Sequence, residues 1–105
     1  MVYTIDELSR IIIPIAQKYK ISTVYIFGSY ARGDATDDSD VDIMIKREGS
    51  MIKGLLMGAL YEELREGIGK GLDLITEESL EQHDYKNIRS WFYENTINER
   101  IKVYG

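Results

Sequence analysis

Apolar residues recur at the spacing of one helix face at the start of the chain. They occupy positions Ile5, Leu8, Ile12, Ile15, Ala16 and Tyr19. This pattern predicts an amphipathic helix over about residues 4–19. Thr4 stands three residues before Glu7, which is typical of a capping box at a helix N-terminus. Pro14 removes one backbone hydrogen bond inside this helix, so we expect a local bend there.

Four short segments rich in β-branched and apolar residues favour strands instead, over residues 23–27, 41–46, 71–75 and 100–104. A second helix is expected over about residues 51–66, capped by Ser50 and stopped by the glycines that follow it. Its predicted inward-facing residues are Ile52, Leu55, Leu56, Ala59, Leu60 and Leu64. A helical turn over 77–82 and a last helix over about 85–98 complete the pattern.

The order of these elements predicts an α/β (α+β) fold, with helices packed on a small mixed β-sheet. A chain of 105 residues is expected to form one domain, spanning residues 1–105. No apolar run approaches the roughly 20 residues of a membrane span. Asp6 and Glu7 interrupt the N-terminus early, which argues against a signal peptide. We therefore expect a cytoplasmic protein without membrane contact.

Composition narrows the chemistry. The chain has no cysteine, which excludes disulfides, thiolate catalysis and zinc–thiolate sites. Its net charge of −5 argues against broad binding to a nucleic-acid backbone, which draws on clustered Lys and Arg. A small anionic ligand held together with metal ions remains compatible with this charge.

The apolar run at 41–45 is interrupted by a carboxylate, Asp42, whose burial needs a cation or a metal nearby. Residues two apart on a strand project to the same face, so Asp40 and Asp42 point together. Asp73 sits in a second apolar strand, and would join them if the two strands are neighbours. Three carboxylates suit a pair of Mg²⁺ or Mn²⁺ ions. The alternative is a solvated acidic loop entering an edge strand, which the added presence of Asp73 makes the weaker interpretation.

A Gly28–Ser29 pair ends the strand that precedes this region. Glycine at a strand end lets a ligand approach the backbone closely. If Ser29 begins a short helix, its free N–H groups and hydroxyl face an anion such as a phosphate. Arg32 has two open roles, a phosphate contact or a pair with a nearby aspartate that holds the loop, and the second is favoured. Metal ions beside a phosphate site favour phosphoryl or nucleotidyl transfer.

The stretch GSYARGDATDDSDVDIMI resembles the Gly-Ser…Asp-x-Asp signature of the DNA polymerase beta-like nucleotidyltransferases. The chain is similar over nearly its whole length to the minimal nucleotidyltransferases of the MntA antitoxin type, which pair with HEPN-domain toxins. The resemblance implies the polymerase beta-like fold. It also implies that Gly28 and Ser29 bind the nucleotide phosphates, that Asp40 and Asp42 bind the metals, and that Asp73 is the third carboxylate.

Two hypotheses of different classes follow. In the first, the protein is an Mg²⁺-dependent nucleotidyltransferase that uses two ions. It moves AMP from ATP to a hydroxyl, and the resemblance implies a tyrosine of a HEPN toxin as the acceptor. In the second, the protein is an antitoxin without catalysis that covers its partner's active site. Adenylylation of a small molecule is less favoured, because no second domain is present to build that pocket. Nucleotide preference and the homo- or hetero-oligomeric state are left open.

Overall fold

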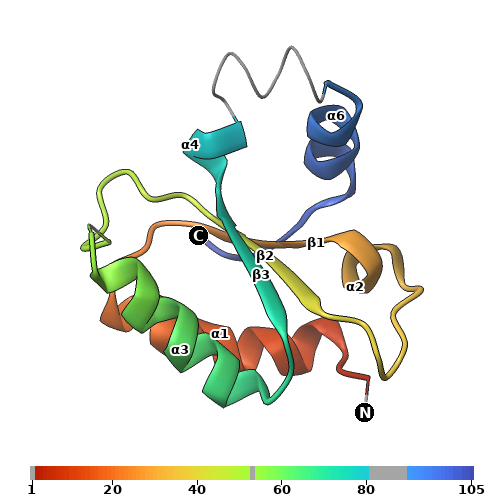
Figure 1. Ribbon diagram of the computed structural model, residues 1–105, viewed down its shortest axis with the longest axis horizontal. Coiled ribbons are helices and arrows are strands. Elements are labelled where there is room, and N and C mark those ends of the chain that lie inside the picture. The colour runs from red at the N-terminus through yellow and green to blue at the C-terminus, as the bar shows by residue number, and fades with distance from the viewer. Residues whose placement is uncertain (1, 53, 81–89) are drawn as a thin grey trace.

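The computed structural model describes the backbone of residues 2–52, 54–80 and 90–105, and their side chains except those of residues 80 and 90–93. Within these residues the chain forms a four-stranded mixed sheet in the order β3-β2-β1-β4, with helices around it (Figure 1). The strands are β1 (Val24–Phe27), β2 (Val41–Ile45), β3 (Leu72–Thr76) and β4 (Ile101–Tyr104). All four were predicted, and their ends differ from the predicted ones by one residue at most.

The direction of the strands differs across the sheet. Strand β1 pairs antiparallel with both β2 and β4, whereas β2 and β3 run parallel. The parallel pair needs a crossover, which is supplied by helix α3 (Leu56–Ile68). This connection brings the two strands that carry the predicted site carboxylates side by side.

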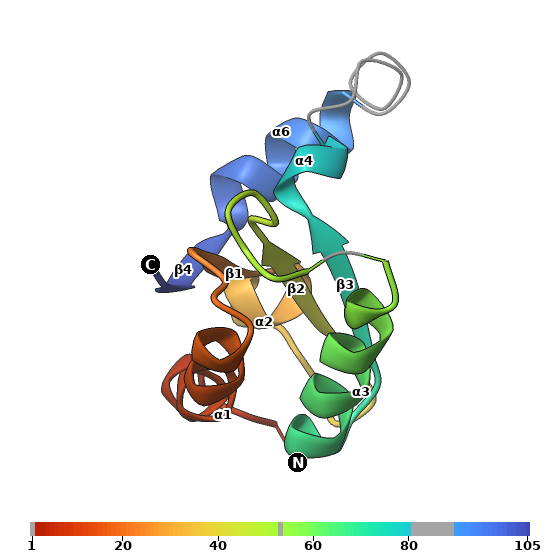
Figure 2. The same ribbon diagram turned by 90° about the vertical axis from the view of Figure 1, so that its left-hand side faces the viewer.

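The first helix, α1 (Ile5–Lys18), begins as its sequence predicts. The hydroxyl of Thr4 accepts a hydrogen bond from the Glu7 N–H at 3.1 Å, and the Thr4 N–H donates to the Glu7 carboxylate at 2.8 Å. The helix continues through Pro14. It packs with α3 on one side of the sheet, as Figures 1 and 2 show together. The main core lies there, and its largest fully buried side chains include Leu8, Ile12, Ile26, Ile43, Leu60 and Leu64.

Helix α3 starts later than predicted, which corrects part of the predicted inward face. Its N-cap is Leu55, without a side-chain cap, and Leu55 is 95% exposed. Leu56 and Ala59 are also exposed, so all three were wrongly assigned to the core. The reason is Gly54, whose φ of 53° belongs to no right-handed helix and resets the helix after it. Ser50 caps the preceding turn instead, where its hydroxyl accepts from the Ile52 N–H.

The opposite side of the sheet carries a second, smaller apolar cluster, formed by buried Phe27 and Met44 with Tyr25 and Ile75 packed against them. Helix α4 (Glu77–Leu80) and helix α6 (Ser90–Glu99) lie at this end of the molecule, away from α1 and α3 (Figure 2). The Arg100 guanidinium stacks on the Tyr25 ring at 3.9 Å from its centroid. The same group pairs with Glu77 at 2.9 Å, so it ties the end of α6 to the start of α4.

Two predictions reach beyond the described residues. The helical turn predicted over 77–82 is described as far as Leu80, and the start of the helix predicted over 85–98 lies outside the described residues. No helix in the described parts of the chain is long and apolar enough to span a bilayer.

Candidate active site

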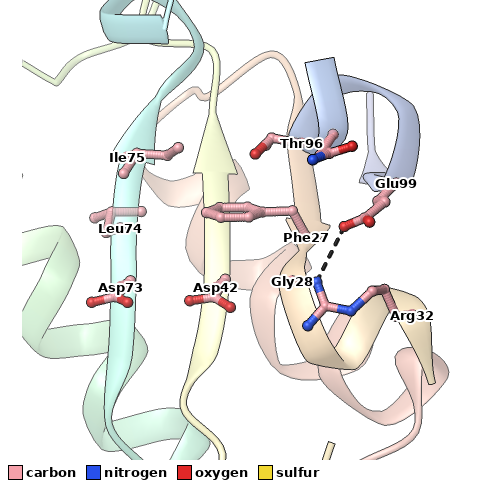
Figure 3. A pocket seen from close by; sticks show the side chains of 10 residues that line it. Phe27, Gly28, Arg32, Asp42, Asp73, Leu74, Ile75, Thr96 and Glu99 are labelled. Carbon is pink, nitrogen blue, oxygen red and sulfur yellow. Dashed lines mark hydrogen bonds and ion pairs between the residues drawn. The ribbon is translucent and has the colours of Figure 1, made fainter. Parts of the chain in front are cut away.

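The parallel pairing of β2 with β3 places two carboxylates next to each other. Asp42 and Asp73 are direct partners in the register of these strands, and their side chains lie side by side on one face of the sheet (Figure 3). Strand alternation explains the shared face, because Val41 and Ile43 point into the main core on the other side. The sequence analysis required β2 and β3 to be neighbours for Asp73 to join the site, and the structure confirms that they are.

The Asp42 carboxyl lies in an unfavourable electrostatic environment for a negative charge. Its pKa is raised from the ordinary 3.8 to about 6, chiefly by burial, then by a side-chain hydrogen bond with Asp73 and by the negative charges of Asp73 and Asp40. The positive charge of Arg32 opposes the rise. Carboxylates crowded in this way are a donor set that fits a hard divalent cation, since such an ion would offset the repulsion between them.

Asp40 precedes strand β2 and does not belong to this cross-strand pair. Asp40 is exposed, and its carboxylate lies against the backbone of Gly71. If residue 71 had a Cβ atom, that atom would lie 2.6 Å from Asp40 Oδ1. Among the described residues, no three acidic or histidine side chains come close enough together to hold a metal ion. A metal site with three aspartates thus stays a prediction, and it requires the Asp40 side chain to turn toward Asp42.

The Gly28–Ser29 turn opens the short helix α2 (Gly28–Arg32), which follows β1 directly. Gly28 has a φ of 71°, which disfavours any other residue. A Cβ at this position would also stand 2.0 Å from Asp42 Oδ2. The glycine therefore does something that the sequence did not reveal, because it makes room for the carboxylate of Asp42 itself. No side chain caps the start of α2, and Ser29 lies in its first turn.

Arg32 ends α2 and bridges two acids. Its Nε lies 3.3 Å from Asp34 Oδ2, and its Nη1 lies 3.2 Å from Glu99 Oε2 (Figure 3 shows the pair with Glu99). The pair with a nearby aspartate was the favoured sequence interpretation, and the structure contains it. Glu99 was missed, because 67 residues separate it from Arg32 and no local signal connects them.

Strands β1, β2 and β3 together with helices α2 and α6 line an open cavity of about 420 Å³, a size in the range of small-molecule sites. It is lined by Phe27, Gly28, Arg32, Asp42, Asp73, Leu74, Ile75, Asn95, Thr96 and Glu99. Asp40 and Ser29 are not among the lining residues.

Helix α6 supplies three lining residues that sequence reasoning did not assign to the site. These three polar residues lie within about one helical turn, so their spacing could have predicted a polar face of this helix. The sequence could not have shown that this face lines the cavity beside Asp42 and Asp73.

Known proteins are similar to this chain in sequence. The family described as "Polymerase beta, Nucleotidyltransferase" matches residues 10–104. The Methanocaldococcus jannaschii relative named "Putative protein adenylyltransferase MJ0435" is 35% identical over 100 residues, which cover 94% of this chain and 97% of the relative. "Protein adenylyltransferase MntA" of Thermococcus cleftensis is 32% identical over 90 residues, which cover 81% and 89%.

Among solved structures, one described as "Crystal structure of the toxin-antitoxin with AMP-PNP" matches with a TM-score of 0.69 at 19% identity, covering 92% of this chain and 73% of that one. A likeness at this identity shows the polymerase beta-like fold, whereas the sequence matches show the family. The chain therefore belongs to the polymerase beta nucleotidyltransferase family of enzymes.

Proposed function

We propose that this nucleotidyltransferase moves AMP from ATP to a tyrosine hydroxyl of a HEPN-domain toxin, with Mg²⁺ as the metal, and so acts as a cytoplasmic antitoxin. The observation that carries the proposal is the pairing of Asp42 with Asp73 beside the Gly28–Ser29 turn. The names of the adenylyltransferase relatives support a protein acceptor. The similar solved structure is described as a toxin–antitoxin with AMP-PNP. Its AMP-PNP supports ATP as the donor here, and its toxin supports a toxin as the partner.

The carboxylates fit the metal that this reaction needs. Asp42 and Asp73 would hold the Mg²⁺ ions, and Asp40 would join them after its side chain turns away from Gly71. When bound, such ions neutralise phosphate charge and favour departure of the leaving group. The raised pKa of Asp42 supports this assignment, because part of the rise comes from negative charges that a cation would offset.

The protein residues position the reacting groups. In the proposed step, the acceptor hydroxyl oxygen bonds to the α-phosphorus of ATP, the bond between that phosphorus and the oxygen bridging to the β-phosphate breaks, and pyrophosphate leaves. The hydroxyl proton passes to a carboxylate, for which we propose Asp73. Asp73 is exposed and lies on the edge strand β3, so an acceptor can reach it from solvent. The first turn of α2, with the Ser29 hydroxyl, would face the departing phosphates.

The acceptor would come from another protein. The cavity has room for one small molecule, and the net charge of −5 disfavours a nucleic-acid acceptor. A macromolecular partner that brings its own hydroxyl to the cavity satisfies both constraints.

The test compares modification with binding. The chain and a HEPN-domain partner are incubated with ATP and Mg²⁺, and intact-mass spectrometry reads the partner's mass. We expect the addition of one or more AMP groups with wild type and none with an Asp40→Asn/Asp42→Asn double variant. The Asp37→Asn/Asp38→Asn double variant changes charge equally on the exposed loop nearby and should modify normally.

A pull-down of the same variants separates the enzyme from a purely steric antitoxin. The Asp40→Asn/Asp42→Asn variant should still bind the partner but should not protect cells at low expression. Full protection by this variant with an unmodified partner would overturn the transferase and favour the interaction module. At high expression, mass action alone could let it protect by blocking, so the low-expression result decides.

A further inference from the structure

Helix α6 forms one side of the cavity, next to α2 (Figure 3). Asn95, Thr96 and Glu99 occupy one side of this helix and line the cavity. In Figure 3, Thr96 and Ile75 lie at one end of the cavity, and Asp42 and Asp73 lie at the other. If the triphosphate is held near Asp42 and Gly28, the cavity leaves room for the nucleoside toward the end lined by Thr96 and Ile75.

That end suits a base better than a phosphate. The sheet side offers the apolar side chains of Phe27 and Ile75, against which the face of an aromatic base can pack. The charged groups of the cavity are already accounted for: Arg32 pairs with Glu99, and Asp42 and Asp73 would take the metal. Asn95 and Thr96 are the neutral polar residues that remain.

Asn95 is the one of these two with an accessible side chain. Thr96 is buried at 4% exposure, whereas Asn95 is exposed to the cavity and to solvent. The Asn95 amide makes no hydrogen bond to any other residue in the described part of the chain. An unpaired primary amide offers one acceptor oxygen beside a donor NH₂ group.

This donor–acceptor pair matches one purine and not the other. Adenine presents an N6 amine next to a ring nitrogen acceptor, which an asparagine amide contacts with two hydrogen bonds. The corresponding edge of guanine presents two acceptors, O6 and N7, which leave the amide oxygen facing an acceptor. Building on the proposed nucleotide transfer, we propose that Asn95 is the specificity-determining residue that selects adenine over guanine nucleotides.

The test measures binding alone, so it needs neither the partner nor turnover. Calorimetry with Mg²⁺ and the non-hydrolysable analogues AMP-PNP and GMP-PNP gives a Kd for each. Wild type should prefer AMP-PNP by about 5- to 150-fold, the range expected for one bidentate base contact. Asn95→Ala should bring the two Kd values together. Asn95→Asp should reduce or reverse the preference, because a carboxylate accepts from the N1 and N2 donors of guanine.

The matched control is Asn98→Asp, which makes the same change at an exposed position of the same helix that does not line the cavity. It should keep the wild-type ratio of the two Kd values. A merely structural role of Asn95 would weaken both analogues equally, and an unchanged ratio in Asn95→Ala or Asn95→Asp overturns the assignment. Equal binding of both analogues by wild type also overturns it and leaves the proposed transfer standing. If wild type binds neither AMP-PNP nor GMP-PNP, both the assignment of Asn95 and the proposed nucleotide transfer are overturned.

Discussion

Replacement of Asp42 by asparagine should stabilise the metal-free protein while abolishing transfer. The pKa of Asp42 is raised from 3.8 to about 6, which by linkage corresponds to about 3 kcal/mol against the charged form at neutral pH. Asp42 is only partly buried, so screening by solvent reduces this to about 1–2 kcal/mol. Asparagine carries no charge, and its amide can still donate a hydrogen bond to Asp73.

The sign of the pH dependence follows from proton binding. Between about pH 4 and pH 6 the folded protein keeps a proton on Asp42 that the unfolded chain has lost. The contribution of Asp42 to the wild-type free energy of unfolding therefore decreases as the pH rises through this window. The Asp42→Asn variant lacks this contribution, so its advantage should be absent below about pH 4 and complete above about pH 6.

Thermal and urea unfolding in EDTA at several pH values measure this difference. At pH 7.5 we expect Asp42→Asn to unfold about 5–10 °C above wild type, from the usual relation between stability and Tm in domains of this size. Asp38→Asn, which removes the same charge at an exposed position in the loop before β2, is the control and should leave the Tm close to that of wild type. Added Mg²⁺ should raise the Tm of wild type more than that of Asp42→Asn. Equal or lower stability of Asp42→Asn, with no dependence on pH, would refute the reasoning.

Other substitutions test the turn and the fold. Gly28→Ala should lower stability by about 1–3 kcal/mol in urea unfolding and weaken AMP-PNP binding, because its φ is positive and a Cβ would collide with Asp42; normal binding would contradict this geometry. Ser29→Ala should weaken AMP-PNP binding by about 1–2 kcal/mol in calorimetry with an unchanged Tm, the loss of one hydrogen bond to a charged oxygen; unchanged affinity would remove Ser29 from the phosphate site. Thr4→Ala should cost about 1 kcal/mol of unfolding free energy by removing the α1 cap, with AMP-PNP affinity unaltered; a change in affinity would show that α1 influences the site.

Much of the local structure could be predicted because its signals are local. The capping box of α1 needs only Thr4 and Glu7, and the strands show runs of β-branched and apolar residues. The start of α3 could not be predicted in the same way. An apolar pattern continues from Ile52 to Leu60, but the backbone at Gly54 interrupts the helix and leaves Leu55 in solvent. Periodicity reports which residues are apolar, and it does not report where the backbone changes direction.

The sequence by itself determined the polymerase beta-like motif, the short strand before Gly28 and the presence of carboxylates inside apolar strands. Only the tertiary structure decided which of these groups meet. The parallel register puts Asp42 beside Asp73, the turn at Gly28 makes room for the Asp42 carboxylate, and α6 brings Glu99 to Arg32. Helix and strand periods arise from the geometry of a few neighbouring residues. Contacts between distant segments depend on strand order and helix packing, which the whole chain sets cooperatively.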